Sequence, residues 1–252
     1  MPTEPQPARP RYQQIADELR HAIETGQYPP GAKIPGENKL MEEHGVARNT
    51  ARQALAVLRD LGLTEARKGS GIYVRAFRPI RRNAVSRLSQ EQWGSGRSIW
   101  AADLDDRPLQ TVDIEVVEVE APDRIATVLE LPAGSRVWRR SRTFVVDGEP
   151  VNRAVSYLPA DVVAGSRITE VDTGPGGTYA RLAELGYKPT RFREEIRVRM
   201  PLPDEADTLQ LPPATPVILV ARIAVDERGR VVEVNEMAMN SSRYILEYDF
   251  TS

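Results

Sequence analysis

The sequence predicts an α+β protein with two domains: a helical N-terminal domain that ends in a β-hairpin, and a C-terminal domain in which an antiparallel sheet carries helices. Up to Gly62, apolar residues recur at intervals of three and four, the spacing of a buried helical face. From Thr111 onward, β-branched and aromatic residues gather in strand-length runs separated by turn sequences. With 252 residues, of which 40% are hydrophobic, the chain is long enough for two ordinary domains with separate cores.

Three helices are predicted before Gly62. A turn-rich run from Gly26 to Gly31 separates the first helix from a short second one, which ends near Gly45. Gly62 closes the third helix, because glycine readily enters the left-handed conformation that follows a last helical turn. The predicted buried positions are Tyr12, Ile15, Ala16, Leu19 and Ile23 in the first helix, Leu40 and Met41 in the second, and Ala51, Ala54, Leu55, Leu58 and Leu61 in the third.

A β-hairpin with a cationic tip is predicted directly after the third helix. Residues 63–66 can form a short strand, and residues 72–74 supply a β-branched and aromatic return strand. The tip between them, residues 67–71, contains Arg67, Lys68 and two glycines. Three helices followed by such a hairpin indicate a winged helix-turn-helix.

The exposed face of the third helix carries Arg48, Asn49, Arg52 and Gln53. An Arg fork can donate two hydrogen bonds to guanine, and a carboxamide can pair with adenine, so these residue types suit the reading of base edges. The free N–H groups at the helix start can also contact a phosphate. In isolation such a face is ordinary solvated helix surface, but its place in a winged helix-turn-helix makes double-stranded DNA the expected partner.

The segment from Tyr12 to Val74 resembles the winged-helix domain of the GntR family of bacterial transcription regulators. The resemblance implies a DNA role for Arg48, Thr50 and Arg52, and also for Asn49, Gln53, Lys68 and Gly69. Gly36, Asn38 and Ala47 depart from the family pattern, in which a small hydroxyl residue or Ala, an Arg, and a Ser or Thr are usual. The matching residues are Tyr12, Gln14, Ile15 and Ala16; Pro30 and Gly31; Ile34, Pro35 and Glu37; Arg48, Thr50, Arg52, Ala54 and Leu55; and Lys68 to Gly71.

Composition is consistent with a bacterial cytoplasmic regulator that associates with the nucleoid through DNA. The chain has no Cys, which excludes a disulfide framework, and it has no signal-peptide pattern or apolar run long enough to span a membrane. The net charge of −2 is unevenly divided. Residues 1–98 hold 16 Lys and Arg against 10 Asp and Glu, whereas the rest of the chain holds 18 against 26.

Five arginines follow the hairpin closely, and they predict a basic linker over residues 77–92. Such a linker can follow the phosphate backbone, or it can be a solvated tether between domains. The predicted organisation is a flexible tail over residues 1–10, a DNA-binding domain over 11–76, this linker, and a second domain over 93–252. The five arginines are Arg75, Arg78, Arg81, Arg82 and Arg87.

The second domain is predicted to contain six strands and two helices. Asp147 and Gly148 form a hairpin turn, and residues 226–229 form another. Strand runs interspersed with helices favour a sheet with helices on one face. The predicted strands are 111–119, 136–146, 151–157, 190–198, 217–225 and 231–239, and the predicted helices are 121–129 and 179–185.

This second half resembles the effector-sensing UTRA domain of the HutC subfamily of GntR regulators, whose fold is similar to that of chorismate lyase. The resemblance implies homodimerisation and a pocket for a small, often anionic, metabolite. Arg140 and Arg142 correspond to the arginines that hold the anion in relatives, and their spacing places both on one sheet face. A surface ladder of ion pairs that includes Arg139 and Arg153 explains the same pattern equally well.

Three further residues are expected in this pocket. Tyr179 and Glu233 fall at pocket-lining positions of relatives, and Thr178 follows the glycine-rich run 172–177 at the start of a helix, where N–H groups can meet an anion. A flexible connection is the alternative for that run. No cofactor or metal site is expected.

The sequence therefore predicts a dimeric repressor that binds a palindromic operator and responds to a small molecule. One alternative is an autoregulatory or plasmid-transfer repressor whose second domain only dimerises. A lyase-like enzyme is a remote alternative, since the only histidines, His21 and His44, lie in the DNA-binding domain. We therefore expect no catalytic residues.

Overall fold

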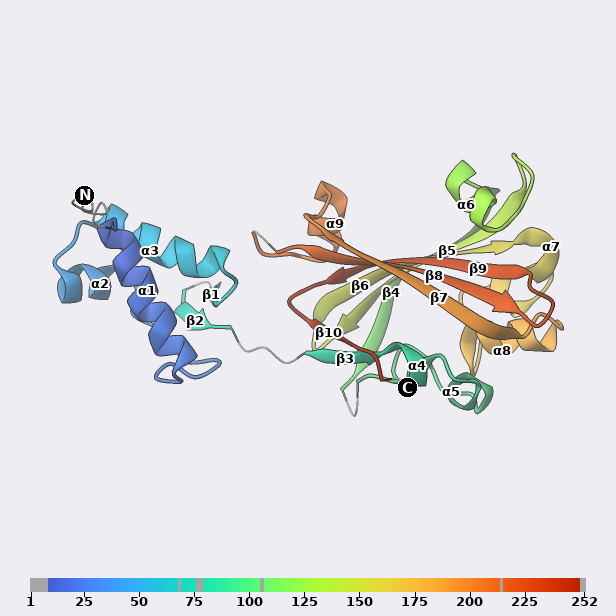
Figure 1. The fold of residues 1–252 in the computed structure, drawn as a ribbon, viewed down its shortest axis with the longest axis horizontal. Coiled ribbons are helices and arrows are strands. Elements are labelled where there is room, and N and C mark those ends of the chain that lie inside the picture. Colours follow the sequence, from blue (N-terminus) through green and yellow to red (C-terminus); the bar gives the residue numbers. More distant parts are fainter. Residues whose placement is uncertain (1–8, 68, 76–78, 105–106, 214, 250–252) are drawn as a thin grey trace, which may run out of the picture. The chain divides into compact units, whose positions relative to one another are not determined.

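A computed structural model describes residues 9–67, 69–75, 79–104, 107–213 and 215–249 (Figure 1). The chain divides into two compact units, the first made of residues 1–78 with 213–215 and the second of residues 79–212 and 216–252. Both the helical first unit and the antiparallel sheet of the second confirm the predicted α+β class. Within the described ranges, no helix has the length and apolar character needed to cross a membrane.

The first unit packs three helices against a hairpin. Ile15, Leu40 and Leu58 are completely buried at its centre. Leu61 was predicted in the same core but is 55% exposed, because the helix ends one residue earlier and Leu61 occupies the cap position. Gly45 ends the second helix in the left-handed conformation, with φ of 61°. The elements are α1 (Arg11–Glu24), α2 (Glu37–His44), α3 (Arg48–Asp60), β1 (Thr64–Arg67) and β2 (Gly71–Val74).

The second unit is built on a six-stranded antiparallel sheet with the strand order β4-β5-β6-β9-β8-β7. All six strands were predicted, and every end lies within two residues of its predicted position. The turn at Asp147 and Gly148 joins β5 to β6, as predicted. The strands are β4 (Leu109–Glu120), β5 (Arg136–Val146), β6 (Glu149–Pro159), β7 (Pro189–Arg199), β8 (Val217–Asp226) and β9 (Val231–Asn240).

Helices cover both faces of this sheet, not one face only. In Figure 1, α4, α5 and α8 lie on one side, whereas α6 and α9 lie at opposite ends of the other side. Leu158 and Leu182 pack in the core of the first side, and Ile125 packs in the core beneath α6. The remaining elements are β3 (Ile80–Asn83), α4 (Ala84–Arg87), α5 (Gln90–Gly94), α6 (Asp123–Val128), α7 (Ala160–Val163), the 3-10 helix η1 (Arg167–Thr169), α8 (Gly177–Glu184), α9 (Pro203–Thr208) and β10 (Tyr244–Glu247).

The basic linker predicted over residues 77–92 is wrong for residues 79–92, which belong to the second unit. Strand β3 pairs in parallel with β10, near the other end of the chain. The side chains of Arg82 and Arg87 are only 0% and 3% exposed, so they cannot follow a DNA backbone. Each is instead paired with a buried carboxylate, which neutralises the positive charge on which the linker prediction was based. Arg78 lies outside the described residues.

Candidate functional site

The exposed face of α3 presents the predicted polar side chains together. Arg48, Asn49, Arg52 and Gln53 are exposed, and Thr50 is half-buried. The residue that caps the helix start, Ala47, makes no side-chain hydrogen bond to the first turn. The Thr50 N–H donates to the Ala47 carbonyl oxygen at 3.0 Å, so the N–H groups of Arg48 and Asn49 are the ones left for an outside acceptor such as a phosphate.

Weak contacts orient the two arginines of this face. Arg52 Nη2 donates to Asn49 Oδ1 at 2.9 Å, and Arg48 Nη2 donates to Asn38 Oδ1 at 3.3 Å. Arg48 Nε also lies 3.8 Å from a carboxylate oxygen of Glu37. Exposed contacts of this kind contribute about 0–1 kcal/mol, so both guanidinium groups can turn to a stronger partner at little cost.

The wing is an antiparallel hairpin formed by β1 and β2. The Arg67 guanidinium lies 4.3 Å from the centroid of the Tyr73 ring, and Ser70 Oγ lies 2.6 Å from Tyr73 Oη. Gly69 is exposed at the tip with φ of 72°, a conformation that a residue with a side chain rarely adopts. Lys68, the remaining predicted residue of the wing, lies outside the described residues.

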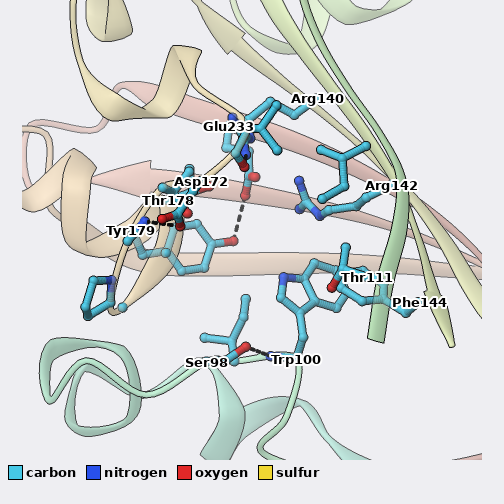
Figure 2. A pocket seen from close by; sticks show the side chains of 18 of the residues that line it. Ser98, Trp100, Thr111, Arg140, Arg142, Phe144, Asp172, Thr178, Tyr179 and Glu233 are labelled. Carbon is cyan, nitrogen blue, oxygen red and sulfur yellow. Dashed lines mark hydrogen bonds between the residues drawn. The ribbon is translucent and has the colours of Figure 1, made fainter. Parts of the chain in front are cut away.

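A cavity of about 440 Å³ opens in the second unit, on the side of the sheet that carries α8. All five residues predicted for an effector site line this cavity (Figure 2), although three separate chain segments supply them. They are Arg140 and Arg142 on β5, Thr178 and Tyr179 on α8, and Glu233 on β9.

Arg140 and Arg142 are buried, with only 4% and 8% of their surfaces exposed, so the surface ion-pair ladder is wrong for these two residues. Arg140 donates through Nη1 to the carbonyl oxygens of Ile168 and Glu170, and through Nη2 to that of Val171 at 3.1 Å. Its fork is therefore committed to the backbone next to η1.

Arg142 makes fewer hydrogen bonds to the protein than Arg140 does. Its Nη2 donates to Ser156 Oγ at 3.1 Å, and its guanidinium lies 5.1 Å from the centroid of the Trp100 ring. Burial lowers the pKa of Arg142 to about 10, so the group remains charged at neutral pH. A buried cation with one neutral hydrogen-bond partner is well suited to receive an anion.

Glu233 connects the helix to the sheet at the back of the cavity. Tyr179 Oη donates to Glu233 Oε2 at 2.7 Å, and Arg222 Nη2 lies 3.7 Å from the same oxygen. Burial raises the pKa of Tyr179 well above its usual value, which keeps the phenol protonated as a donor.

Two important lining residues, Arg222 and Trp100, were not predicted from the sequence. Arg222 interrupts an otherwise apolar strand, and this charge within a run of residues expected to be buried could have marked it as a candidate site residue. Trp100 lies in an irregular segment and stacks on Phe144, with ring centroids 4.2 Å apart. Trp100 and Phe144 therefore form an aromatic wall of the cavity, and Arg222 adds a cation to its lining.

The glycine-rich run before α8 forms part of the cavity wall, and Gly176 is its closely packed residue. Asp172 Oδ1 accepts a hydrogen bond from the Gly174 N–H at 2.8 Å. Gly176 has φ of 76°, and a Cβ atom there would lie 2.6 Å from both Ala180 Cβ and the Trp93 carbonyl oxygen. Only glycine fits at this position, and the run holds Thr178 at the edge of the cavity.

Comparisons with known proteins agree with this architecture. Residues 11–74 match the family model of the bacterial regulatory proteins, gntR family, and residues 106–245 match that of the UTRA domain. An HTH-type transcriptional regulator of Streptomyces coelicolor is 31% identical, over 97% of this chain and 94% of the relative. The Bacillus subtilis transcriptional repressor NagR is 22% identical, over 93% of this chain and 92% of the relative.

Solved structures give the same result. The crystal structure of PhnF from Mycobacterium smegmatis has a TM-score of 0.60 and 25% identity, and the match covers 94% of this chain and 99% of that chain. The relatives and the family models describe regulators, which confirms the prediction that the chain is not an enzyme. The chain therefore belongs to the GntR family of bacterial transcription regulators, with a winged helix-turn-helix DNA-binding domain and an effector-binding UTRA domain.

Proposed function

We propose that this protein is a homodimeric transcriptional repressor of the bacterial cytoplasm, bound to the nucleoid through its operators. In this proposal, a small anionic metabolite in the cavity of the second unit controls its affinity for a palindromic operator. The observation that carries the proposal is the cavity itself, in which buried cations from β5 meet polar groups from α8 and β9. NagR, a relative along nearly its whole length, is named a repressor, which supports the same direction of control.

For DNA recognition we assign the base-reading role to Arg48, Asn49 and Arg52 in the first turns of α3. Gln53 extends this face, and the Thr50 hydroxyl together with the N–H groups of Arg48 and Asn49 contacts phosphate. Lys68 and Gly69 are assigned to the backbone contacts of the wing. Because Asn38 and Ala47 replace residue types that contact DNA in relatives, specificity depends chiefly on the arginines of α3.

A DNA-binding measurement tests this assignment. With an operator fragment selected from random duplexes by the unaltered protein, Arg48→Ala and Arg52→Ala should each weaken binding by about 1–3 kcal/mol. Arg59→Ala is the matched control, because Arg59 lies on the same helix, is exposed and pairs only with Asp60 at its C-terminal end. Equal affinities for all four proteins would contradict the assignment.

For dimerisation we assign the edge strand β7. Ile196 and Val198 are 39% and 63% exposed on this strand, and Met200 directly after it is 55% exposed. The three alternate along the chain, so they form one apolar row at an edge whose backbone groups can pair with another strand. A palindromic operator needs two recognition helices, and a second copy held on this row brings the second helix.

Oligomeric state tests the assignment of β7. Val198→Asp should give a monomer by light scattering, because it places a charge in the apolar row. Val112→Asp is the control, since Val112 is also exposed but lies on β4, at the opposite edge of the sheet. A dimer that survives Val198→Asp, or one lost only with Val112→Asp, would place the interface elsewhere.

Contacts between the cavity and β3 support control by a ligand. The Arg87 guanidinium lies 5.2 Å from the centroid of the Trp100 ring, and Arg87 Nη1 lies 2.9 Å from Asp103 Oδ2. Asp103 Oδ1 accepts the N–H of Asn83, the last residue of β3, at 3.2 Å. A ligand that shifts Trp100 can therefore shift β3 and α4, the first elements of the second unit. Such a shift can change the fraction of molecules whose DNA-binding domains are arranged to bind the operator.

A metabolite screen tests control by a ligand. Phosphorylated sugars, amino-acid derivatives and acidic metabolites are screened by thermal shift, and the compounds that bind are then tested for release of the operator. Combining Arg140→Ala and Arg142→Ala should remove this response and leave DNA affinity intact. Asp103→Asn removes the carboxylate of the buried pair with Arg87, so its folding is checked first; the folded variant should retain binding of the compound and weaken its effect on DNA. If no compound changes DNA affinity, the second domain serves dimerisation alone.

A further inference from the structure

We infer that Arg222 on β8 acts with Arg142 to hold the acidic group of the effector, and that this group carries two negative charges. Arg140, the other predicted anion ligand, has a positioning role instead. The inference rests on the proposed function, because it concerns the ligand of the same cavity. It differs from the sequence-based expectation, which paired Arg140 with Arg142.

Arg140 has few donors left for a ligand. Its two terminal nitrogens already donate to the carbonyl oxygens of Ile168, Glu170 and Val171. Both N–H groups of Nη1 are used, so an anion could recruit Nη1 only by breaking one of its hydrogen bonds, which costs about 1–3 kcal/mol where the carbonyl is buried. This leaves one N–H of Nη2 and the buried Nε as the donors not used by the backbone. The geometry therefore assigns Arg140 to holding the chain at η1, next to the glycine-rich wall of the cavity.

Arg222, in contrast, makes few hydrogen bonds to the protein. It is 1% exposed and lines the cavity, yet its Nε and Nη1 have no hydrogen-bond partner within the described ranges. Its nearest carboxylate, that of Glu233, lies 3.7 Å away, and the oxygen concerned already accepts from Tyr179. A buried guanidinium that lacks partners is costly, and an anion in the cavity would reduce that cost.

The guanidinium groups of Arg142 and Arg222 lie near the same aromatic ring. Their Cζ atoms are 5.1 Å and 5.5 Å from the centroid of Trp100. An acidic group bound beside this ring can therefore be reached by both planar donor groups, which suit the oxygens of a phosphate or a carboxylate.

The balance of charge around the cavity gives the charge of the ligand. Among the described lining residues, Arg140, Arg142 and Arg222 are buried cations and Glu233 is the one buried carboxylate. Asp172 also lines the cavity, but its side chain is 82% exposed and pairs with Arg167. Two positive charges therefore lack a buried counter-charge, and a dianionic group such as a phosphate monoester or a dicarboxylate would neutralise them.

The experiment uses simple anions on the full chain. Thermal unfolding is followed by tryptophan fluorescence with sulfate, inorganic phosphate or succinate as dianions and acetate as the monoanion, at pH 8 and constant ionic strength. All three Trp residues lie in the second unit, so the signal reports on that unit. Binding to the native state raises the Tm with anion concentration. The dianions should raise the Tm more than acetate does, and the size of the succinate response relative to phosphate distinguishes carboxylate from phosphate ligands.

Substitutions at two positions, Arg222 and Arg139, separate anion binding from a structural role. Arg222→Gln should abolish the dianion-dependent rise and lower the Tm without anion only modestly, because the one carboxylate near Arg222, that of Glu233, lies 3.7 Å away and also accepts from Tyr179. Arg139→Gln is the matched control and should keep the response, since Arg139 precedes Arg140 on the same strand and pairs with Glu115. Arg222→Lys keeps the charge without the fork, and it should retain a reduced response if Arg222→Gln fails to fold.

The outcomes are distinguishable. A dianion response that persists in Arg222→Gln, or is lost only when Arg140 is replaced by Gln, would overturn the assignment of Arg222. Equal responses to acetate and to the dianions would overturn the inferred charge. If none of the anions changes the Tm of the unaltered protein, the proposed anionic effector is itself wrong, and the role of Arg222 fails with it.

Discussion

Glu194→Gln should strongly destabilise the second unit, because Glu194 holds β3 against the sheet through a buried ion pair. Both of its carboxylate oxygens accept from Arg82, one of them at 2.8 Å. The side chains of the two residues are only 7% and 0% exposed. Glutamine keeps the shape of the side chain but leaves the Arg82 cation buried without its counter-charge.

The burial of this pair determines the expected magnitude. Breaking a buried pair by neutralising one partner costs about 3–5 kcal/mol, whereas losing an exposed pair costs about 0–1 kcal/mol. Glu195→Gln provides the exposed comparison on the adjacent residue, since Glu195 is 61% exposed and pairs with Arg193 at 3.0 Å. We therefore expect the free energy of unfolding to fall by about 3–5 kcal/mol for Glu194→Gln and by less than about 1 kcal/mol for Glu195→Gln.

Urea denaturation followed by tryptophan emission measures both values, because the emission comes from the second unit alone. Burial tends to raise the pKa of Glu194, but the hydrogen bonds and charge of Arg82 outweigh burial and lower it below 4.5. The unfolded chain then takes up this proton more readily than the folded chain. The contribution of the pair is thus complete above pH 4.5 and is lost as the pH falls through the lowered pKa.

The difference between the unaltered protein and Glu194→Gln should consequently shrink as the pH is lowered from neutrality to below 4. Equal losses for Glu194→Gln and Glu195→Gln at neutral pH would refute the reasoning. A large difference that persists unchanged in acid would show that Gln disturbs packing and not charge.

Three further substitutions have expected outcomes. Leu158→Ala removes a completely buried side chain from the core beneath α8 and should lower the free energy of unfolding of the second unit by about 2–5 kcal/mol, measured by the same fluorescence assay. Tyr179→Phe removes the donor to Glu233 and should cost about 1–3 kcal/mol in that assay; no change would mean that another donor satisfies the carboxylate. Ala47→Ser supplies the missing cap of α3 and should stabilise the first unit by about 0.5–2 kcal/mol, measured by circular dichroism, while an unchanged midpoint would argue that the cap is satisfied in another way.

The sheet could be predicted because its strands carry local signals. The alternation along β5 and the turn at Asp147 and Gly148 depend only on neighbouring residues, so the hairpin appears in the sequence itself. Strand β3 carries no such signal, since its four residues include two arginines and its partner β10 lies near the other end of the chain. Sequence-based reasoning therefore assigned Arg82 and Arg87 to a linker, because their counter-charges are brought close only by the fold.

The candidate cavity shows the same division between local and long-range information. A spacing of two residues places Arg140 and Arg142 on one face of β5, and both line the cavity. The spacing does not reveal that backbone carbonyls next to η1 occupy one of these guanidinium groups. Nor does it reveal Arg222, which reaches the same cavity from β8 because β8 lies in the same sheet.

The partners of the buried arginines separate those that hold the fold from those proposed to bind the ligand. Arg82 and Arg87 each have a buried carboxylate within 3 Å, and both lie in the segment that follows the boundary between the units. Arg142 and Arg222 have no carboxylate closer than 3.7 Å among the described residues, and both line the cavity. Because an unpaired buried charge is costly, it persists only where function compensates for the loss of stability. The absence of a close carboxylate partner, more than the presence of an arginine, therefore marks the anion site, and it explains why Glu194→Gln should destabilise the protein more than Arg222→Gln does.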